Sequence, residues 1–220
     1  VWYCSDNGGL DIDPDAVGYL RGHKGDLFEG GIRVPGIIEW PGHIQPQATD
    51  FPASTMDIMP TIVDLLNLPK DSLLEVHDGE SIAALFEGKT PKRAHAIPFR
   101  FQKGAALIDG DYKLLSTKVI EDDAWQLFDL KNDPSETKDL SAELAGRFAA
   151  MKSKAGKMLR SVESSAAGQD YPEGQVLQTP RIAFWKDMPE YKPHLETFAK
   201  HQGSPRSKKK PGRTSKKESE

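Results

Sequence analysis

The sequence predicts an α/β protein in which the end of a mixed-sheet domain, residues 1–92, precedes a small α+β subdomain, residues 93–165. Three observations predict this fold class. A short apolar run at residues 1–4, typical of a buried strand, is followed by a turn sequence that contains Gly8 and Gly9. Apolar residues then recur at helical spacing in residues 54–66. Short β-like runs fill residues 94–130, and an amphipathic segment follows them.

The elements of the first part follow from local patterns. Residues 1–4 are apolar without polar alternation, which indicates a strand buried on both faces, of the kind found in parallel sheets. Residues 10–33 are rich in glycine and predict a long loop, and residues 34–40 predict a short strand. The helix in 54–66 takes Asp57 as its N-cap and ends before Pro69. A short helix in 78–89 stops at Gly88.

The second part predicts an antiparallel sheet with one packed helix. Residues 94–101, 104–115 and 124–130 are β-like, and residues 109–111 form a hairpin turn. The helix in 141–163 presents one apolar face, made of Leu144, Phe148, Met151, Ala155 and Leu159. Residues 166–203 are predicted to be an extended segment partly packed on the body, and residues 204–220 a disordered basic tail.

Composition limits the classes of function. The net charge is −4, but the tail carries seven basic residues against two glutamates, while the rest of the chain is acidic. Such a tail either contacts a polyanion or is a solvated terminus, and without interleaved aromatic residues it predicts no nucleic-acid binding. The single cysteine, Cys4, excludes an internal disulfide framework. No apolar stretch is long enough to be a transmembrane segment.

Asp6 and Asn7 follow the first predicted strand and precede two glycines. Ligands of open α/β sheets bind beyond the carboxyl ends of strands, and carboxylate and amide oxygens suit a hard cation. The same residues also make a good plain turn. These residues alone leave both readings open.

The segment "LRGHKGDLFEGGIRVPGIIEWPG", residues 20–42, resembles the type I sulfatases of the alkaline-phosphatase superfamily. Their chains carry a DNG turn and then the pattern KGxxxEGGxRVPxxxxWPG. The matching residues are Asp6, Asn7, Gly8, Lys24, Gly25, Glu29, Gly30, Gly31, Arg33, Val34, Pro35, Trp40, Pro41 and Gly42. The likeness continues in residues 54–66 and 78–89 and in "WQLFDLKNDPSETKDLS", which is similar to the closing LYDLxxDPxExxNL element of the family. It covers about 140 of the 220 residues.

The resemblance implies an alkaline-phosphatase-like sheet domain and a sulfuric ester hydrolase acting on aryl or carbohydrate sulfates. Asp6 and Asn7 match the pair that binds a divalent cation, usually Ca²⁺. Lys24 matches the catalytic lysine that contacts the sulfate group of the substrate. The neighbouring His23 is placed to touch substrate or to transfer a proton.

Two further matching residues, Glu29 and Arg33, are interpreted as structural, because they can satisfy backbone groups or each other. The acidic loop at residues 11–15 either borders the pocket, where it would tune substrate choice, or is a solvated loop. By family analogy the protein is expected in the periplasm or outside the cell.

One departure from the family pattern concerns the nucleophile. Type I sulfatases use a formylglycine made in a C/S-x-P-x-R motif, which this sequence lacks, and Cys4 is followed by "SDNG". The formylglycine and the remaining metal ligands are therefore expected in an N-terminal half of the fold, which would be a partner of this chain. Alone, the chain is expected to be inactive.

Two alternatives to a sulfatase remain open. One is a phosphonate or phosphodiester hydrolase of the same superfamily, which shares the metal site. The other is a non-catalytic module that binds sulfated glycans through Lys24 and the basic tail.

Overall fold

The computed structural model describes residues 1–12, 16–74, 77–118, 124–170 and 188–197. The chain divides into two compact units, residues 1–175 and 176–220. In the second unit the described part contains the 3-10 helix Pro189–His194. The predicted basic tail and most of the predicted segment 166–203 lie outside the described residues. The predicted boundary after residue 92 falls inside the first unit and stays a prediction.

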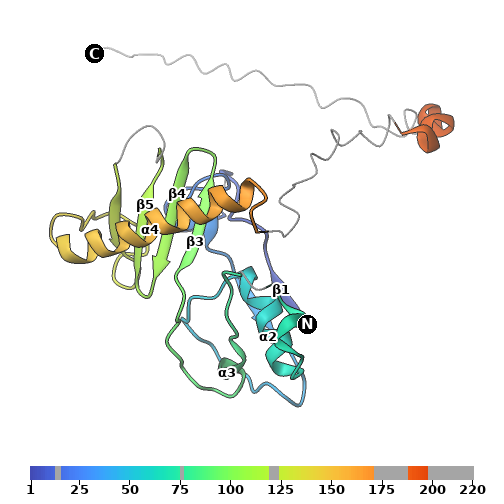
Figure 1. Cartoon of the computed structure of the whole chain (residues 1–220), viewed down its shortest axis with the longest axis horizontal. Coiled ribbons are helices and arrows are strands. Elements are labelled where there is room, and N and C mark those ends of the chain that lie inside the picture. The colour runs from blue at the N-terminus through green and yellow to red at the C-terminus, as the bar shows by residue number, and fades with distance from the viewer. Residues whose placement is uncertain (13–15, 75–76, 119–123, 171–187, 198–220) are drawn as a thin grey trace, which may run out of the picture. The chain divides into compact units, whose positions relative to one another are not determined.

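Among the described residues, the N-terminal part of the first unit contains a two-stranded sheet and three helices (Figure 1). Strand β1 (Trp2–Cys4) pairs antiparallel with β2 (Gly36–Ile38). The helices are α1 (Glu29–Ile32), α2 (Ile58–Leu65) and α3 (Ala83–Phe86), and two 3-10 turns span Thr55–Asp57 and Lys70–Ser72. The long loop predicted for residues 10–33 thus ends in a short helix.

The predicted environment of β1 was wrong for this chain. The strand is antiparallel to its partner, and Tyr3 is 60% exposed. In the part of the chain that the structure describes, β2 is the only strand that pairs with β1. An apolar run cannot become buried on both faces without further layers above and below it.

Asp57 plays a larger part than the predicted helix cap. It precedes α2, as predicted, but makes no side-chain cap bond to that helix. Its carboxylate instead accepts two hydrogen bonds from Arg93, at 2.7 and 2.8 Å. It also accepts the backbone N–H groups of Ser54 at 2.7 Å and Glu80 at 2.9 Å. This buried carboxylate therefore joins three segments that are distant in the sequence.

The C-terminal part is the predicted antiparallel sheet, in the order β3-β4-β5-β6. The strands are β3 (Ile97–Phe101), β4 (Gly104–Asp109), β5 (Tyr112–Ser116) and β6 (Gln126–Asp129). The predicted hairpin turn between β4 and β5 is confirmed, and its Gly110 has a φ of 61°. This positive φ suits glycine, which lacks a Cβ.

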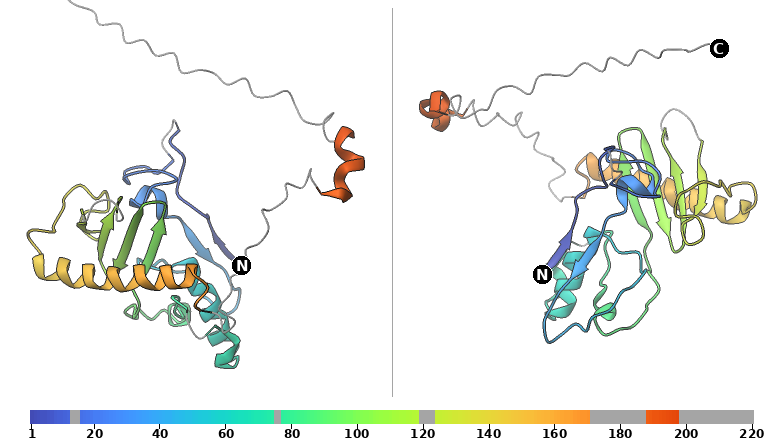
Figure 2. Two further views of the ribbon diagram at one scale, coloured as in Figure 1. Left: turned by 45° about the horizontal axis from the view of Figure 1, so that its top comes forward. Right: turned by 180° about the vertical axis from the view of Figure 1, so that it is seen from behind.

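Each face of this sheet is covered by a different segment (Figures 1 and 2). Helix α4 (Ala145–Ala166) packs on one face through Met151 and Ala155. The view from behind in Figure 2 shows α1 on the opposite face, where Leu27 joins a core cluster with Ala106, Leu115 and Phe128. The predicted sheet-packing helix is confirmed. The glycine-rich loop segment that leads into α1 forms the second covering layer.

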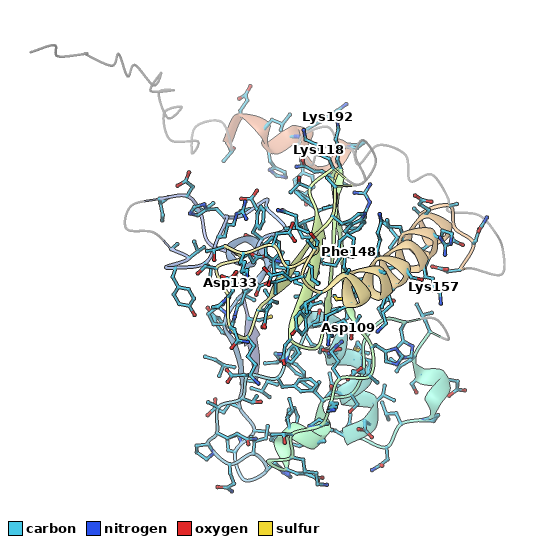
Figure 3. The ribbon with its side chains drawn as sticks, turned by 90° about the vertical axis from the view of Figure 1, so that its left-hand side faces the viewer. Asp109, Lys118, Asp133, Phe148, Lys157 and Lys192 are labelled. Carbon is cyan, nitrogen blue, oxygen red and sulfur yellow. The ribbon has the colours of Figure 1, made fainter. Side chains whose placement is uncertain are left out.

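Side chains of α4 divide between the core and the outside. Phe148 packs against the cluster on the α4 face, whereas Lys157 is exposed, and both are labelled in Figure 3. This split agrees with the predicted apolar face of the helix. None of the described helices is both long and apolar enough to cross a bilayer.

The Asp57–Arg93 pair yields a test of stability. The two side chains are 0% and 3% exposed, so Arg93→Ala leaves a buried carboxylate without its cation. We expect the free energy of unfolding of the full chain to fall by about 3–5 kcal/mol in urea denaturation followed by circular dichroism. Lys138→Ala is the matched control, because its pair with Glu143 is 62% and 58% exposed. The control should change stability by less than about 1 kcal/mol, and equal effects of the two changes would contradict the assignment.

Candidate functional site

The turn after β1 presents Asp6 and Asn7 at the edge of the two-stranded sheet. Asp6 is exposed and Asn7 is half-buried. The hydroxyl of Ser5 donates to the Asn7 carbonyl at 2.8 Å, and the Gly8 N–H donates to the Gly31 carbonyl at 2.9 Å. The turn is therefore tied to α1, in the matching "EGG" segment.

The loop that carries Lys24 lies against the same turn. The backbone N–H of Lys24 donates to the Gly9 carbonyl at 2.7 Å, two residues beyond Asn7. The loop closes on itself where the His23 N–H donates to Asp26 Oδ2 at 3.0 Å. The Lys24 side chain is exposed. The structure thus brings the backbone of Lys24 together with the Asp6–Asn7 turn.

His23 lies beside Lys24 and faces the acidic loop. Its side chain is 29% exposed, and its Nε2 lies 4.0 Å from Asp11 Oδ1. The contact places the start of the predicted acidic loop next to this histidine. The predicted acidic positions Asp13 and Asp15 lie outside the described residues.

Two glycines of the matching pattern permit backbones to touch. A Cβ added to Gly8 would lie 1.9 Å from the Gly30 carbonyl oxygen, and one added to Gly30 would lie 2.0 Å from the Gly22 carbonyl oxygen. Both obstacles are main-chain atoms, which cannot rotate away as a side chain can. The DNG turn, the Lys24 loop and α1 therefore stack directly, backbone on backbone.

A pocket of about 600 Å³ opens beside the turn. Its lining includes Asn7 and Arg33 together with apolar side chains such as Val17 and Val34. Arg33 is half-exposed there, and its Nη1 lies 4.0 Å from Glu29 Oε2. A guanidinium and a carboxamide in one pocket can bind an anionic or polar group.

The side chains of Asp6 and Asn7 are of the chemical type that binds a hard cation. Their carboxylate and amide oxygens are donors that Ca²⁺ prefers, but that ion takes about six to eight oxygens. No group of three or more His, Cys, Asp or Glu side chains able to hold a metal exists within the described residues. The pair can therefore supply part of a coordination shell.

A buried ion triad lies beneath the loop. Lys113 of β5 is fully buried, and its Nζ lies 3.0 Å from Glu29 Oε1 and 2.8 Å from Glu136 Oε1. The second contact is a charge contact without good hydrogen-bond geometry. The other oxygen of Glu136 accepts the Glu29 backbone N–H at 2.6 Å. These contacts agree with the structural interpretation of Glu29, but the main partner of its carboxylate is Lys113 rather than Arg33.

The triad holds two carboxylates and one ammonium. Burial raises the pKa of Glu136, and the charge of Lys113 opposes this rise. The neighbouring Glu29 carboxylate adds to the rise. Glu136 therefore keeps its proton to a higher pH in the folded chain than in the unfolded chain.

Residues around Glu136 form an ordered turn. Asp129 accepts a side-chain hydrogen bond from Asn132, which is the first cause of its lowered pKa. Burial opposes the lowering of the Asp139 pKa, but hydrogen bonds from the backbone N–H groups of Leu127 and Ser141 and from the side chains of Ser141 and Gln126 together outweigh it. These bonds fix the closing element of the sequence to β6.

The sequence did not predict that Lys113 and Glu136 belong to this network. Lys113 sits in an apolar strand, and its inward position became visible only with the register of the sheet. A signal for Glu136 was present, because it is the glutamate of the quoted "DPSE" element.

The close approach of Gly30 predicts a large effect of one methyl group. Gly30→Ala should lower the free energy of unfolding by at least about 2 kcal/mol, because the new Cβ meets main-chain oxygen. In Gly146→Ala, the control in α4, the added Cβ meets nothing within 4 Å, so stability should hold or rise by up to about 1 kcal/mol. Urea denaturation of both variants checks this. A Gly30→Ala chain as stable as the control would refute the backbone stacking.

The raised pKa of Glu136 predicts a pH dependence. Between the ordinary value of 4.5 and the raised pKa, the folded chain holds a proton that the unfolded chain has released, so the unfolding free energy falls as pH rises. Glu136→Gln removes this fall and should flatten the profile relative to wild type. Urea denaturation from pH 4 to 8 measures it, with Glu143→Gln, an exposed glutamate, as control. Parallel profiles for wild type and Glu136→Gln would contradict the assignment.

Comparisons with known proteins give the family. The model of the C-terminal region of N-sulphoglucosamine sulphohydrolase matches residues 23–163. Human steryl-sulfatase is 37% identical over 112 residues, which are 46% of this chain and 19% of that protein. Human arylsulfatase A is 29% identical over 154 residues, 59% of this chain and 30% of that protein. The chain spans less than a third of the length of these two relatives.

A solved structure shares the fold. It comes from work on the metabolism of multiple glycosaminoglycans by Bacteroides thetaiotaomicron, with a TM-score of 0.60 and 25% identity. The match covers 74% of this chain and 38% of that chain. The predicted fold class, an alkaline-phosphatase-like sheet followed by a small antiparallel sheet with a packed helix, is confirmed. The chain belongs to the N-sulphoglucosamine sulphohydrolase C-terminal family and is thus a C-terminal region of the sulfatase type.

Proposed function

We propose that this chain supplies one side of a sulfatase active site, in an enzyme that hydrolyses sulfate esters. The observation that supports this proposal most directly is the hydrogen bond of 2.7 Å between the Lys24 N–H and the Gly9 carbonyl. It holds the predicted sulfate-binding lysine against the turn that bears the predicted metal ligands, Asp6 and Asn7. These roles were predicted from the sequence, and the adjacency of the two backbones supports them.

The roles of the side chains follow from their chemistry. The exposed Lys24 ammonium offers three donors and a full positive charge to a sulfate oxygen, and it stabilises the negative charge that grows there during ester cleavage. Asp6 and Asn7 would hold a divalent cation, which supplies charge neutralisation when bound. His23, next to Lys24 in the chain and near Asp11, is placed to contact the substrate or to move a proton.

The proposed substrate class is aryl or carbohydrate sulfate. Relatives at this level include an arylsulfatase and a steryl-sulfatase, and a structure from work on glycosaminoglycan metabolism shares the fold. We further propose that the formylglycine and the remaining cation ligands belong to the part of the sulfatase fold that these relatives contain and this chain does not span. By the same analogy the enzyme would work in the periplasm or outside the cell.

Replacement of Lys24 tests the proposal. In the complete gene product that carries this chain, Lys24→Ala should lower kcat/KM for an aryl sulfate by about 10²–10³-fold, the range seen when one transition-state donor is removed. Lys157→Ala is the matched control, since Lys157 is also an exposed lysine but lies on α4. The control should keep wild-type rates.

Two outcomes would count against the proposal. Equal rates for Lys24→Ala and Lys157→Ala would remove Lys24 from the site. Faster turnover of a phosphate diester than of the matching sulfate ester by the wild-type enzyme would favour a phosphodiester hydrolase of the same superfamily. We expect the sulfate ester to be the better substrate.

A further inference from the structure

A short segment of the closing element contacts both ends of the loop that carries Lys24. The hydroxyl of Ser135 donates to the Tyr19 carbonyl at 2.8 Å. The carboxylate of Glu136 accepts the Glu29 N–H at 2.6 Å. The loop between these two points, residues 19–29, contains Lys24 at its middle. Two adjacent residues, more than a hundred positions downstream, thus hold both ends of the loop.

Arg21 adds a third contact between the same parts. Its Nη1 donates to the Glu136 carbonyl at 3.0 Å, and its guanidinium lies over the Phe28 ring at 3.9 Å from the centroid. Phe28 packs against the core cluster on the sheet face opposite α4. Arg21 therefore joins the start of the loop, the end of the loop and the closing element.

The holding segment is itself fixed to the sheet. Lys113 reaches from β5 to the carboxylates of Glu29 and Glu136. Asp133 accepts the Thr137 N–H at 2.8 Å and the Lys138 N–H at 2.9 Å, so the turn around Glu136 is closed by its own bonds. Figure 3 labels Asp133 in this turn, away from α4. The loop thus rests on an ordered base.

From these contacts we infer that Arg21, Ser135 and Glu136 are positioning residues for Lys24. They fix loop 19–29 on the C-terminal sheet, and the loop in turn keeps Lys24 beside the Asp6–Asn7 turn. The importance of this for catalysis rests on the proposed function, whereas the order of the loop does not depend on it.

The loop has a physical need for such anchors. Gly22 and Gly25 have φ values of 75° and 101°, and glycine retains more conformational freedom than other residues when a chain segment is released. Ordering each released residue again costs about 1–2 kcal/mol. A lysine on a loose loop would meet a sulfate group in many geometries, and few of them are productive.

Hydrogen exchange of the full chain tests the inference with two mild variants. Ser135→Ala removes the hydrogen bond to the Tyr19 carbonyl, and Arg21→Ala removes the hydrogen bond to the Glu136 carbonyl together with the contact on the Phe28 ring. Both variants leave the buried triad intact. Amides of residues 19–31 should exchange at least about tenfold faster in both variants, while β4 and β5 keep their protection. Arg147→Ala is the matched control. Arg147 lies on α4, and its guanidinium also lies over an aromatic ring, that of Tyr112, at 4.0 Å from the centroid. Exchange in the loop should not change in the control.

Kinetics of the complete gene product then separate positioning from mere order. Arg21→Ala should lower kcat/KM for an aryl sulfate about tenfold at an unchanged melting temperature, and Arg21→Lys should restore part of it. Unaltered loop exchange in both alanine variants, or faster exchange with unaltered kinetics, overturns the inference. If the wild-type enzyme does not cleave sulfate esters at all, the proposed function fails, and loop exchange alone decides whether the three residues order the loop.

Discussion

The buried contact of Lys113 with Glu29 and Glu136 is the interaction on which the rest of the structure depends. Each of the three residues comes from a different part of the chain: β5, the start of α1 and the closing element. Removing Lys113 would leave two buried carboxylates close together without their cation, so both acids depend on this lysine. This shared dependence joins the N-terminal loops to the C-terminal sheet.

Both faces of the sheet are used, and this explains how a small subdomain can orient a loop. Helix α4 covers one face, and the segment around Leu27 and Phe28 covers the other. Apolar packing sets the distance between loop and sheet but is non-directional. The hydrogen bonds of Ser135, Glu136 and Arg21 add the direction. Apolar packing thus fixes how close the loop lies to the sheet, and the hydrogen bonds fix how the loop is oriented on it.

The sequence was sufficient for the parts of the fold that are set by local periodicity. The apolar face of α4 and the antiparallel strands followed from spacing, and so did the end of α2 before Pro69. The prediction that β1 is buried on both faces was wrong, because burial depends on neighbouring layers of structure that no local pattern encodes. Asp6, Asn7 and Lys24 could be singled out by the resemblance, but Lys113 could not, because an inward lysine is recognisable only when its two carboxylate partners are in place.

Glu29 shows how the core and the pocket share one charge. One oxygen faces Lys113 in the interior, and the other lies 4.0 Å from Arg33, which lines the pocket beside Asn7. Arg33 alone would give that wall a full positive charge, and Glu29 offsets part of it. Because a carboxylate close to a guanidinium competes with any incoming anion, Arg33 is the poorer partner for a sulfate group, and in the proposed function the exposed ammonium of Lys24 takes that role. The interpretation of Arg33 as structural and of Lys24 as functional thus has a common electrostatic reason.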